Sequence, residues 1–387
     1  MRIAILTSGI LPVPAVQGGA VENLVDFYLA YNDQHRLHDI TVFSVWHPDV
    51  EKHPALKSEV NHYIYIKVTG WWAKMKKRLY QKTHGEEYYH YVIEYFLEQT
   101  LKQIRKQQYD LIILENRPGY ALKLKKATSA DIVCHLHNDM LNNESQQSTD
   151  IYHAISCFIT VSDYIANRVR TIAPADNKCV TVHNGIDIHA FTPNKLSLRP
   201  ASLNGDDFVI VYSGRLNPEK GIRELIEAMN IITQPLKLLV LGSSFYGNAN
   251  NEDPFLCELK KMAEPIKDRI IFTGFIPYSD IPKYLNMADI AVLPSMWEEP
   301  FGLTMAEAQA TGLPIITTRR GGIPEVVTEE NAILLDVSDH FVDDLAAAIL
   351  DLYSHPEKRK QMSKASLQHA QYYNHQNYAK DFFHALS

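Results

Sequence analysis

Short apolar runs recur along the whole chain, separated by stretches with helical spacing or by loops rich in glycine and proline, and each run predicts a buried strand. In the first half of the chain these strands are expected at residues 3–7, 39–45, 111–115, 132–136, 158–161 and 178–182. In the second half they are expected at residues 209–212, 236–241, 270–273, 290–293 and 315–318. Strands that alternate with helices are typical of parallel sheets. The pattern therefore predicts an α/β protein with two Rossmann-like domains and doubly wound parallel sheets.

The alternation is interrupted once, near the middle of the chain. Residues 193–205 contain proline, serine and asparagine but little apolar periodicity, which indicates a linker. We therefore expect an N-terminal domain over residues 1–190 and a C-terminal domain over residues 191–365. The last stretch, residues 358–386, is helical in pattern and rich in aromatic side chains.

Composition excludes several classes of protein. The chain has 387 residues, enough for two domains with their own cores, and its net charge of −7 argues against a general nucleic-acid binder. Its four cysteines form no Cys-x-x-Cys pair, which indicates neither a zinc site nor a disulfide framework. The N-terminal apolar run is too short for a signal peptide and no run approaches transmembrane length, so we expect a cytoplasmic protein.

The segment over residues 299–307 combines two carboxylates with a helix start. Glu299 precedes a proline, which disfavours helix in the residue before it, so Glu299 is expected in a loop and Glu307 on the helix that follows. The first backbone N–H groups of that helix, at residues 302–304, would form an anion site that suits a diphosphate. The flanking carboxylates could then accept hydrogen bonds from a sugar and a ribose. An ordinary acidic helix start is the alternative interpretation.

Ligands of parallel sheets bind beyond the carboxyl ends of the strands, and several of these ends carry suitable residues. Gly18 and Gly19 follow the first strand, where they either let backbone approach a ligand or form a plain loop hinge. His137 follows the fourth predicted strand and is either a ligand contact or a structural histidine. Arg215 and Lys220 open the second domain, where they either bind a diphosphate or form a solvated surface pair.

In these motifs the chain resembles the family 4 glycosyltransferases, which are retaining enzymes of the two-domain GT-B architecture. The matching motifs are Gly18-Gly19-Ala20, Asn184-Gly185-Ile186-Asp187, Gly214-Arg215-Leu216 with Lys220-Gly221, Gly274-Phe275, the 299–307 segment, Gly312-Leu313-Pro314 and Gly321-Gly322-Ile323-Pro324-Glu325. The resemblance implies an acceptor-binding N-terminal domain and a C-terminal domain that binds a nucleotide sugar. It also implies that a last helix, residues 366–387, crosses back onto the N-terminal domain, and burial there would explain the aromatic side chains.

The resemblance assigns roles to individual residues. Arg215 and Lys220 would bind the diphosphate of the sugar donor, Glu307 would bind the ribose hydroxyls, and Glu299 would contact hydroxyls of the transferred sugar. The full set expected to bind the sugar donor is Gly18, Gly19, Arg215, Lys220, Phe275, Ile276, Glu299, Phe301, Gly302, Leu303, Thr304 and Glu307.

The resemblance also implies how the reaction is catalysed and that it needs no cofactor. Family 4 enzymes retain the anomeric configuration by front-face departure and attack, so Arg215, Lys220, Glu299 and His137 would act mainly through electrostatics and positioning. Main-chain atoms near Phe275 would meet the nucleobase, and UDP is the commonest nucleotide of the family. No Asp-x-Asp occurs in the sequence, so we expect no metal and no other cofactor.

Acceptor contacts are expected in the N-terminal domain. Asp139 would contact an acceptor hydroxyl, while Glu115 and Arg117 either line the acceptor pocket or form a turn. A basic segment with aromatic anchors comprises Trp71, Trp72, Lys74, Lys76, Lys77 and Arg78. This segment either docks on the anionic inner face of a plasma membrane or is a solvated surface. Docking would favour a lipid-linked saccharide acceptor, as in bacterial cell-surface polysaccharide assembly.

The sequence thus predicts a retaining hexosyltransferase that uses a nucleotide sugar and a saccharide acceptor. One alternative is a nucleotide-sugar epimerase of the same architecture, whose acid/base pattern the 299–307 segment does not fit. Another is a binding subunit without catalysis, against which the intact set of Arg215, Lys220, Glu299 and Glu307 argues.

Overall fold

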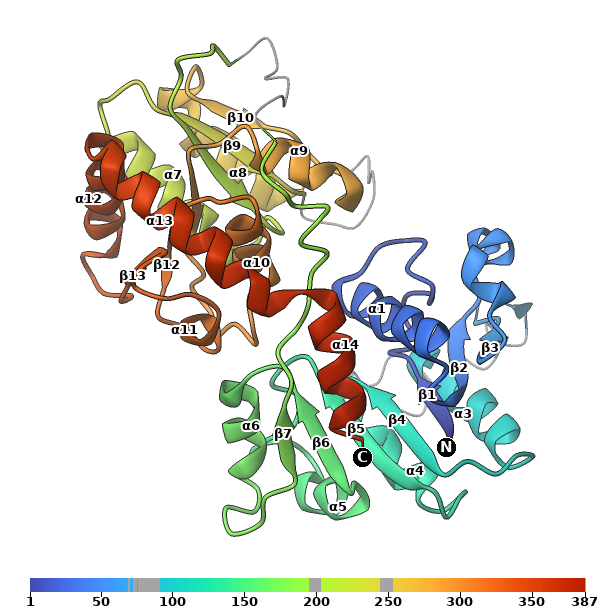
Figure 1. The fold of residues 1–387 in the computed structure, drawn as a ribbon. Helices are drawn as coiled ribbons and strands as arrows, with labels where there is room; N and C mark the ends of the chain where they lie inside the picture. Colours follow the sequence, from blue (N-terminus) through green and yellow to red (C-terminus); the bar gives the residue numbers. More distant parts are fainter. Residues whose placement is uncertain (69, 72–74, 76–90, 195–202, 244–252, 387) are drawn as a thin grey trace. The chain divides into compact units, whose positions relative to one another are not determined.

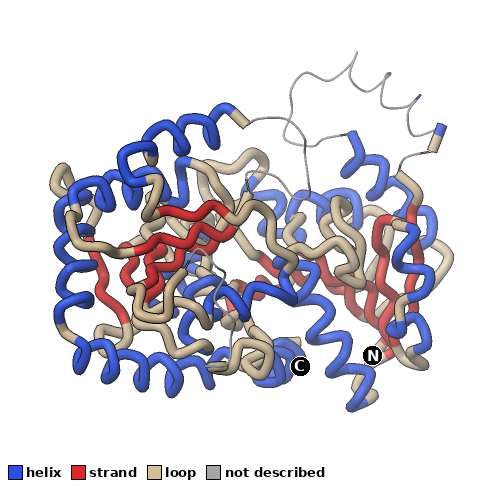
Figure 2. Tube along the Cα trace, turned by 90° about the horizontal axis from the view of Figure 1, so that it is seen from above, coloured by secondary structure: helices blue, strands red, loops and turns tan. Residues whose placement is uncertain are grey.

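The computed structural model describes all residues except 69, 72–74, 76–90, 195–202, 244–252 and 387. The chain divides into two compact units, each with its own sheet (Figure 1). Unit 1 comprises Met1–Gly185 and His375–Ser387, and unit 2 comprises Ile186–Asn374. In Figure 2 the strands of each unit lie among helices that cover them from both sides.

Unit 1 contains a seven-stranded sheet with strand order β3-β2-β1-β4-β5-β6-β7, and every pairing is parallel. Its strands are β1 (Arg2–Leu6), β2 (Asp39–Val45), β3 (Asn61–Ile66), β4 (Leu111–Glu115), β5 (Asp131–Leu136), β6 (Cys157–Thr160) and β7 (Cys179–Thr181). In β1, the residues Ile3 to Leu6 are all fully buried, as expected for a central strand covered on both faces.

Helices connect these strands. They are α1 (Ala20–His35), α3 (Tyr91–Ile104), α4 (Ala121–Leu124), α5 (Ser148–Ala154), α6 (Asp163–Arg170) and, from the end of the chain, α14 (His375–His384). Shorter 3₁₀ turns lie at Pro48–Lys52, Pro54–Lys57 and Pro118–Tyr120. Among these helices α14 packs against α1, where the rings of Tyr28 and Phe382 stack with centroids 4.2 Å apart.

Unit 2 contains a six-stranded parallel sheet with strand order β10-β9-β8-β11-β12-β13. Its strands are β8 (Val209–Ser213), β9 (Lys237–Leu241), β10 (Ile270–Phe272), β11 (Ile290–Leu293), β12 (Ile315–Thr318) and β13 (Ala332–Leu335). Its helices are α7 (Ile222–Ile231), α8 (Pro254–Met262), α9 (Ile281–Leu285), α10 (Leu303–Ala310), α11 (Ile323–Val326), α12 (Phe341–Ser354) and α13 (Pro356–His369). The 3₁₀ turns are Pro218–Lys220, Glu264–Ile266, Tyr278–Asp280 and Ala370–Tyr373. In both sheets the strand order reverses beside the first strand, which makes each unit doubly wound.

All the strands expected from apolar runs are present, together with two further strands that were not predicted. The two are β3 and β13, which form an edge of their respective sheets. Most of their side chains are only partly buried. The sequence of β3 begins with the polar Asn61 and His62, whereas β13 is a short apolar run that was not predicted as a strand.

The C-terminal helix differs from the expectation. Residues 366–387 do not form one helix, because α13 ends at His369 and α14 begins at His375, after a 3₁₀ turn. Tyr373 holds this turn in unit 2, where its ring meets Phe301 edge-on at 5.6 Å and its carbonyl accepts the N–H of Ile186. Only α14 belongs to unit 1, so the units divide after Gly185 and after Asn374 rather than at residues 190 and 365.

The C-terminal aromatics follow this division. Tyr378, Phe382 and Phe383 of α14 are buried in unit 1, Tyr373 is buried in unit 2, and Tyr372 is 75% exposed. All four cysteines are free thiols.

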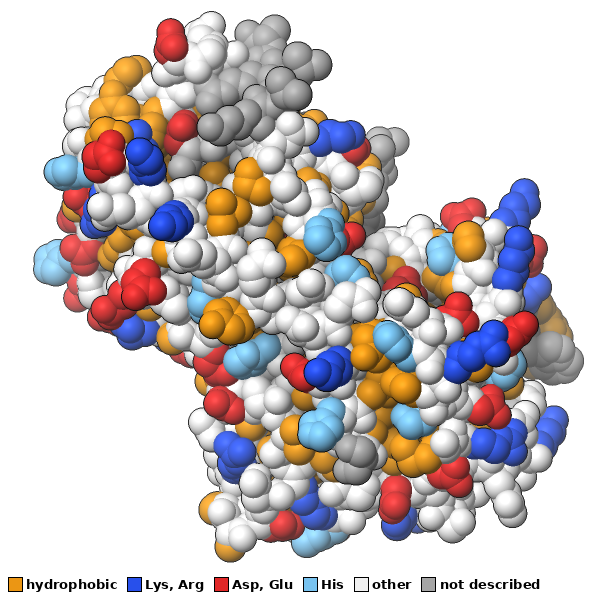
Figure 3. Space-filling model, in the orientation of Figure 1, with side chains coloured by type: hydrophobic (Ala, Val, Ile, Leu, Met, Phe, Trp, Pro, Cys, Tyr) orange, Lys and Arg blue, Asp and Glu red, His pale blue; other side chains and the backbone are white. Residues whose placement is uncertain are grey.

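Two further expectations from the sequence concerned surface charge and transmembrane segments. On the face drawn in Figure 3, acidic and basic side chains are interspersed. Among the described helices, none combines the length and the apolar character that crossing a membrane requires.

Candidate active site

Lys220 and Glu299 form an ion pair in unit 2. Lys220 ends the 3₁₀ turn after β8, and its ammonium group contacts Oε1 of Glu299 and lies 5.3 Å from the ring of Trp297. Glu299 is 7% exposed and also accepts a hydrogen bond of 3.0 Å from the Ser295 hydroxyl. The structure therefore brings together two residues that are far apart in the sequence and that were both expected to meet a sugar donor.

A glycine makes this approach possible. Gly221 has φ of +70°, and a Cβ there would lie 1.8 Å from the carbonyl oxygen of Pro294. The turn that carries Lys220 can therefore pack against the end of β11 only when residue 221 has no side chain.

Helix α10 begins at Leu303, directly after Gly302, whose φ is +103°. The first backbone N–H groups of the helix, which include that of Thr304, have no acceptor within it, and these are the groups that were predicted to form an anion site. Phe301, in contrast, is 2% exposed, and its ring packs on Tyr373. Its side chain therefore belongs to the core of unit 2, and a contact with a sugar donor is left to its main chain.

Glu307 lies on α10 and has a partner that sequence reasoning missed. It is 5% exposed, and the hydroxyl of Tyr278 donates a hydrogen bond to its carboxylate. Burial raises the pKa of Glu307 to about 7, and the Tyr278 hydrogen bond opposes that rise. Glu307 and Glu299 thus have separate partners. Tyr278 follows the carboxyl end of β10, a position at which ligand contacts are common.

The other predicted residues of unit 2 lie at strand ends. Arg215 is exposed after β8, and its carbonyl accepts a hydrogen bond of 3.0 Å from the hydroxyl of Tyr212. Phe275 is 45% exposed after β10, and Ile276 follows it. The side chains of Arg215 and Phe275 are therefore accessible to a ligand.

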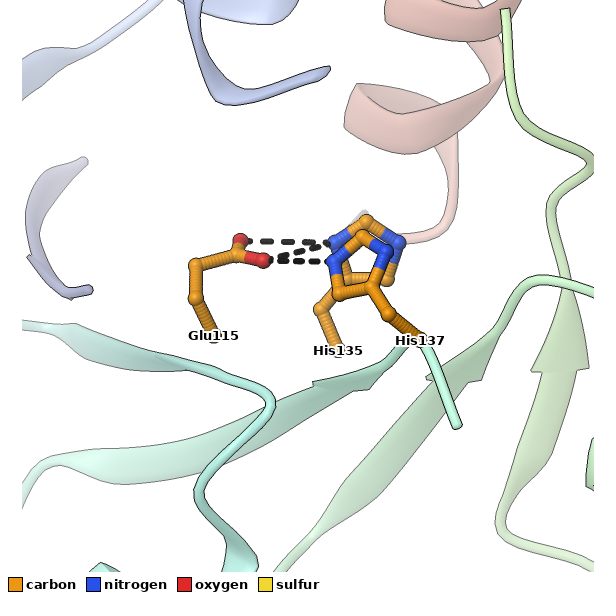
Figure 4. Close-up of side chains that lie close together, drawn as sticks. All are labelled: Glu115, His135 and His137. Atoms are coloured by element: carbon orange, nitrogen blue, oxygen red, sulfur yellow. Dashed lines mark hydrogen bonds and ion pairs between the residues drawn. The ribbon is translucent and has the colours of Figure 1, made fainter. Parts of the chain in front are cut away.

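A cluster of Glu115, His135 and His137 lies in unit 1 (Figure 4). His135 Nδ1 lies 3.1 Å and His137 Nε2 lies 2.9 Å from Oε2 of Glu115, while the Tyr28 hydroxyl donates to Oε1 at 2.9 Å. Glu115 and His135 are fully buried, and the side chain of His137 is 5% exposed. Glu115 was predicted either to line the acceptor pocket or to form a turn, and the partners that enclose it exclude direct contact with an acceptor.

Charge and burial set the protonation of this cluster. Burial alone would raise the pKa of Glu115, but the nearby His135 and the hydrogen bonds from both histidines outweigh it and lower the pKa to about 2. Burial and His135 lower the pKa of His137 to about 4, although Glu115 opposes that shift. At neutral pH, Glu115 is therefore a carboxylate and His137 a neutral imidazole. The three side chains are also of types that bind transition metals, with ligand atoms within 4.8 Å of one another.

Two protein-family descriptions match the chain, one over most of each unit. The description "Glycosyltransferase Family 4" matches residues 28–190, and "Glycosyl transferases group 1" matches residues 195–369. The chain is 30% identical over 386 residues to the putative glycosyltransferase YtcC of Bacillus subtilis strain 168, in an alignment that covers 96% of this chain and 88% of YtcC. This chain belongs to the family 4 glycosyltransferases.

Other similarities extend the family assignment to the fold. The spore coat protein SA of Bacillus subtilis is 29% identical, with 96% of this chain and 95% of that protein covered. HepE of Anabaena, solved in complex with UDP and glucose, has a TM-score of 0.73 at 20% identity and covers 100% of this chain and 99% of its own. Sucrose-phosphate synthase of Thermosynechococcus elongatus has a TM-score of 0.77 at 20% identity, with coverages of 100% and 98%. The expected GT-B fold of this glycosyltransferase is thus confirmed.

The glycine loop of the glycosyltransferase holds a residue that the sequence analysis missed. Gly18 and Gly19 have φ of +74° and +109°, and a Cβ on Gly19 would lie 2.2 Å from Oε2 of Glu22. The Ser8 hydroxyl donates to the other oxygen of Glu22 at 3.2 Å. The Glu22 carboxylate therefore lies against Gly19, where backbone was expected to approach phosphate. Its position three residues after the N-cap residue Gly19 is the signal that could have identified it.

The remaining acceptor-side predictions concern residues with protein partners. Asp139 forms an ion pair of 2.7 Å with Arg168 and accepts a hydrogen bond of 2.9 Å from Asn142. Arg117 is 6% exposed, and its Nε donates to the carbonyl of Ser8 at 3.0 Å. Arg117 thus fits the alternative of a turn whose arginine pairs with a neighbour.

The basic segment is mostly outside the part of the chain that the structure describes. Trp71 is described and is 65% exposed. The other predicted membrane-contact residues, namely Trp72, Lys74, Lys76, Lys77 and Arg78, lie outside the described residues.

Proposed function

We propose that this family member is a retaining hexosyltransferase that transfers a sugar from a UDP-sugar to a hydroxyl of a saccharide acceptor without a metal ion. The ion pair of Lys220 with Glu299, beside the start of α10, is the observation that carries the proposal. A cation, a carboxylate that could accept sugar hydroxyls and the backbone N–H groups of a helix start are the kinds of group that bind a sugar diphosphate, which supports the proposal. HepE, which shares the fold, was solved with UDP and glucose, which supports UDP as the nucleotide.

Charge stabilisation would supply most of the catalysis. The bond between the anomeric carbon and the diphosphate oxygen breaks, and the acceptor oxygen bonds to the same carbon from the same face. The acceptor proton passes to the departing phosphate oxygen. Arg215, Lys220 and the start of α10 would stabilise the negative charge that develops on the diphosphate. Glu307 would exchange its hydrogen bond from Tyr278 for one from a ribose hydroxyl.

We extend the proposal to a lipid-linked acceptor in cell-surface polysaccharide assembly, with the protein peripheral on the inner face of the plasma membrane. The aromatic and basic composition of the segment from Trp71 to Arg78 supports this location. WaaB, which shares the fold with a TM-score of 0.69, is named a lipopolysaccharide outer core galactosyltransferase. Co-sedimentation with anionic liposomes tests this membrane location. If replacing Lys74, Lys76, Lys77 and Arg78 with serine leaves liposome binding unchanged, the location is refuted. The epimerase alternative has no support from the relatives named above.

A panel of nucleotide sugars tests the proposed function directly. The correct donor should raise the melting temperature of the purified protein by mass action and should release UDP slowly in the absence of an acceptor. NMR of the released or transferred sugar should show the anomeric configuration of the donor, and EDTA should not reduce the rate. Inverted product or EDTA-sensitive turnover would refute the retaining or the metal-independent mechanism, respectively. Absence of binding by every nucleotide sugar would refute the proposal as a whole.

A further inference from the structure

The Glu115 cluster is produced by strand pairing in unit 1. Residue Glu115 ends β4 and pairs in register with His135 of β5. Alternate residues of a strand point to the same face, so His135 and His137 lie on one side of the sheet. Parallel pairing therefore gathers one carboxylate and two imidazoles at the carboxyl end of the sheet, where ligands of this fold bind (Figure 4).

The hydrogen bonds of the cluster define where the protons lie. An ionised carboxylate only accepts hydrogen bonds, so each partner of Glu115 must donate. Tyr28 donates its hydroxyl proton, and His135 and His137 donate from Nδ1 and Nε2, respectively. A neutral imidazole has one proton, so His137 with a proton on Nε2 has a lone pair on Nδ1.

Nδ1 of His137 has no hydrogen-bond partner within the described part of the chain, although it is buried. Buried polar atoms in folded proteins are nearly always paired, so a missing partner indicates a ligand or ordered water. The backbone N–H of His137 donates to the side chain of Asn116 at 3.2 Å, so the residue is held at both its main chain and its ring.

We propose that Glu115 is a positioning residue that fixes His137 in the tautomer with the proton on Nε2, so that Nδ1 accepts a hydrogen bond from a sugar hydroxyl. The inference rests on the proposed glycosyl transfer, for which the family resemblance names His137 among the catalytic residues. Glu115 itself touches no substrate, because it is fully buried beneath both histidines and Tyr28. The carboxylate acts on the reaction only through the orientation and proton position of the imidazole.

The tautomer can be measured without any substrate. In protein with ¹⁵N-labelled histidine, long-range ¹H–¹⁵N spectra distinguish protonated from unprotonated ring nitrogens, and His137→Gln identifies the signal of His137. We expect Nε2 protonated and Nδ1 unprotonated in the wild type at neutral pH. Protonated Nδ1 in the wild type would overturn the proposal with no further variant needed.

Glu115→Gln keeps the shape of the side chain but gives His137 an amide that can donate as well as accept. We expect the variant to lose the single tautomer, with a substantial population protonated on Nδ1. Tyr28→Phe is the matched control, because it removes a donor to the same carboxylate and leaves the bond to His137 in place. The Tyr28→Phe control should keep the wild-type tautomer of His137. If both variants lose the single tautomer to a similar extent, the cause is general disruption of the cluster and the specific role of Glu115 is refuted.

Kinetics give a second readout. With the donor identified, Glu115→Gln should lower kcat about 10- to 100-fold, the usual range for a misplaced catalytic contact, while UDP affinity stays unchanged because UDP binds unit 2. Glu59→Gln, an exposed carboxylate of the same unit, should behave as wild type. A Glu115→Gln enzyme with wild-type tautomer and kcat overturns the inference. A wild type that binds no nucleotide sugar refutes the proposed function instead, and the NMR result then still decides the role of Glu115.

Discussion

Lys220 is the residue whose removal separates catalysis most clearly from folding. Lys220→Ala removes the cation beside the expected diphosphate site and leaves Glu299 with the Ser295 hydroxyl as a partner. We expect transfer to fall at least about 100-fold, as for other losses of transition-state charge stabilisation, with unit 2 still folded. Initial rates and circular dichroism measure the two effects.

Lys283→Ala is the control for that substitution. Lys283 also pairs with a carboxylate of unit 2, Asp280, but both are exposed at a helix start. Its rate should match the wild type, and equal rates for Lys220→Ala and the wild type would contradict the assignment of Lys220.

Because the carboxyl of Glu307 is buried, we expect the stability of the protein to depend on pH. Burial raises the pKa of its carboxyl from 4.5 to about 7, so its contribution to folding is complete below pH 4.5 and is lost as pH rises through 7. Glu307→Gln has no such titration. The variant should therefore lose about 3 kcal/mol less stability than the wild type between pH 4.5 and pH 8, as measured by chemical denaturation without nucleotide.

Exposed Glu329 provides the reference for Glu307. Glu329→Gln should follow the wild-type pH curve, which includes the titration of other buried carboxyls such as Asp26. If Glu307→Gln also follows that curve, the carboxyl of Glu307 is ionised in the folded protein at neutral pH.

At the scale of elements, the turn between β8 and α7 depends on one glycine. Gly221→Ala would place a Cβ against the Pro294 carbonyl at a positive φ, and we expect a loss of more than about 2 kcal/mol together with displacement of Lys220. Denaturation curves and UDP affinity should both change. Gly205→Ala, where an added Cβ meets no atom within 4 Å, should change neither. Full UDP affinity in a folded Gly221→Ala protein would show that the turn tolerates a side chain.

The elements themselves could largely be predicted, and the exceptions have a physical cause. Central strands such as β1 and β4 are covered on both faces, so a local apolar run announces them. Edge strand β3 is buried only at its two ends, Asn61 and Ile66, and carries no such run. The break between α13 and α14 was missed because residues 370–374 have a helical pattern, while Tyr373 packs on Phe301 far away in the sequence.

At the scale of the whole molecule, the C-terminus completes the first unit. α14 supplies Phe382, which is fully buried and stacks on Tyr28 of α1. Phe382→Ala should destabilise unit 1 by about 3–5 kcal/mol, because a large buried ring is removed. Amide hydrogen exchange should show the loss in unit 1, with Tyr372→Ala as the exposed aromatic control. Unchanged protection of β4 and β5 in Phe382→Ala would contradict the role of α14 in that core.

The sequence by itself determined the two parallel sheets, the family and most of the residues around the start of α10. Apolar runs and glycine motifs are local, so the amino-acid order displays them without reference to the fold. Tertiary structure decided the partners: Lys220 with Glu299, Tyr278 with Glu307, and Glu115 with both histidines. These contacts depend on strand register and loop packing between distant residues. For that reason Glu115, predicted to line an acceptor pocket or to form a turn, is a buried partner of His137.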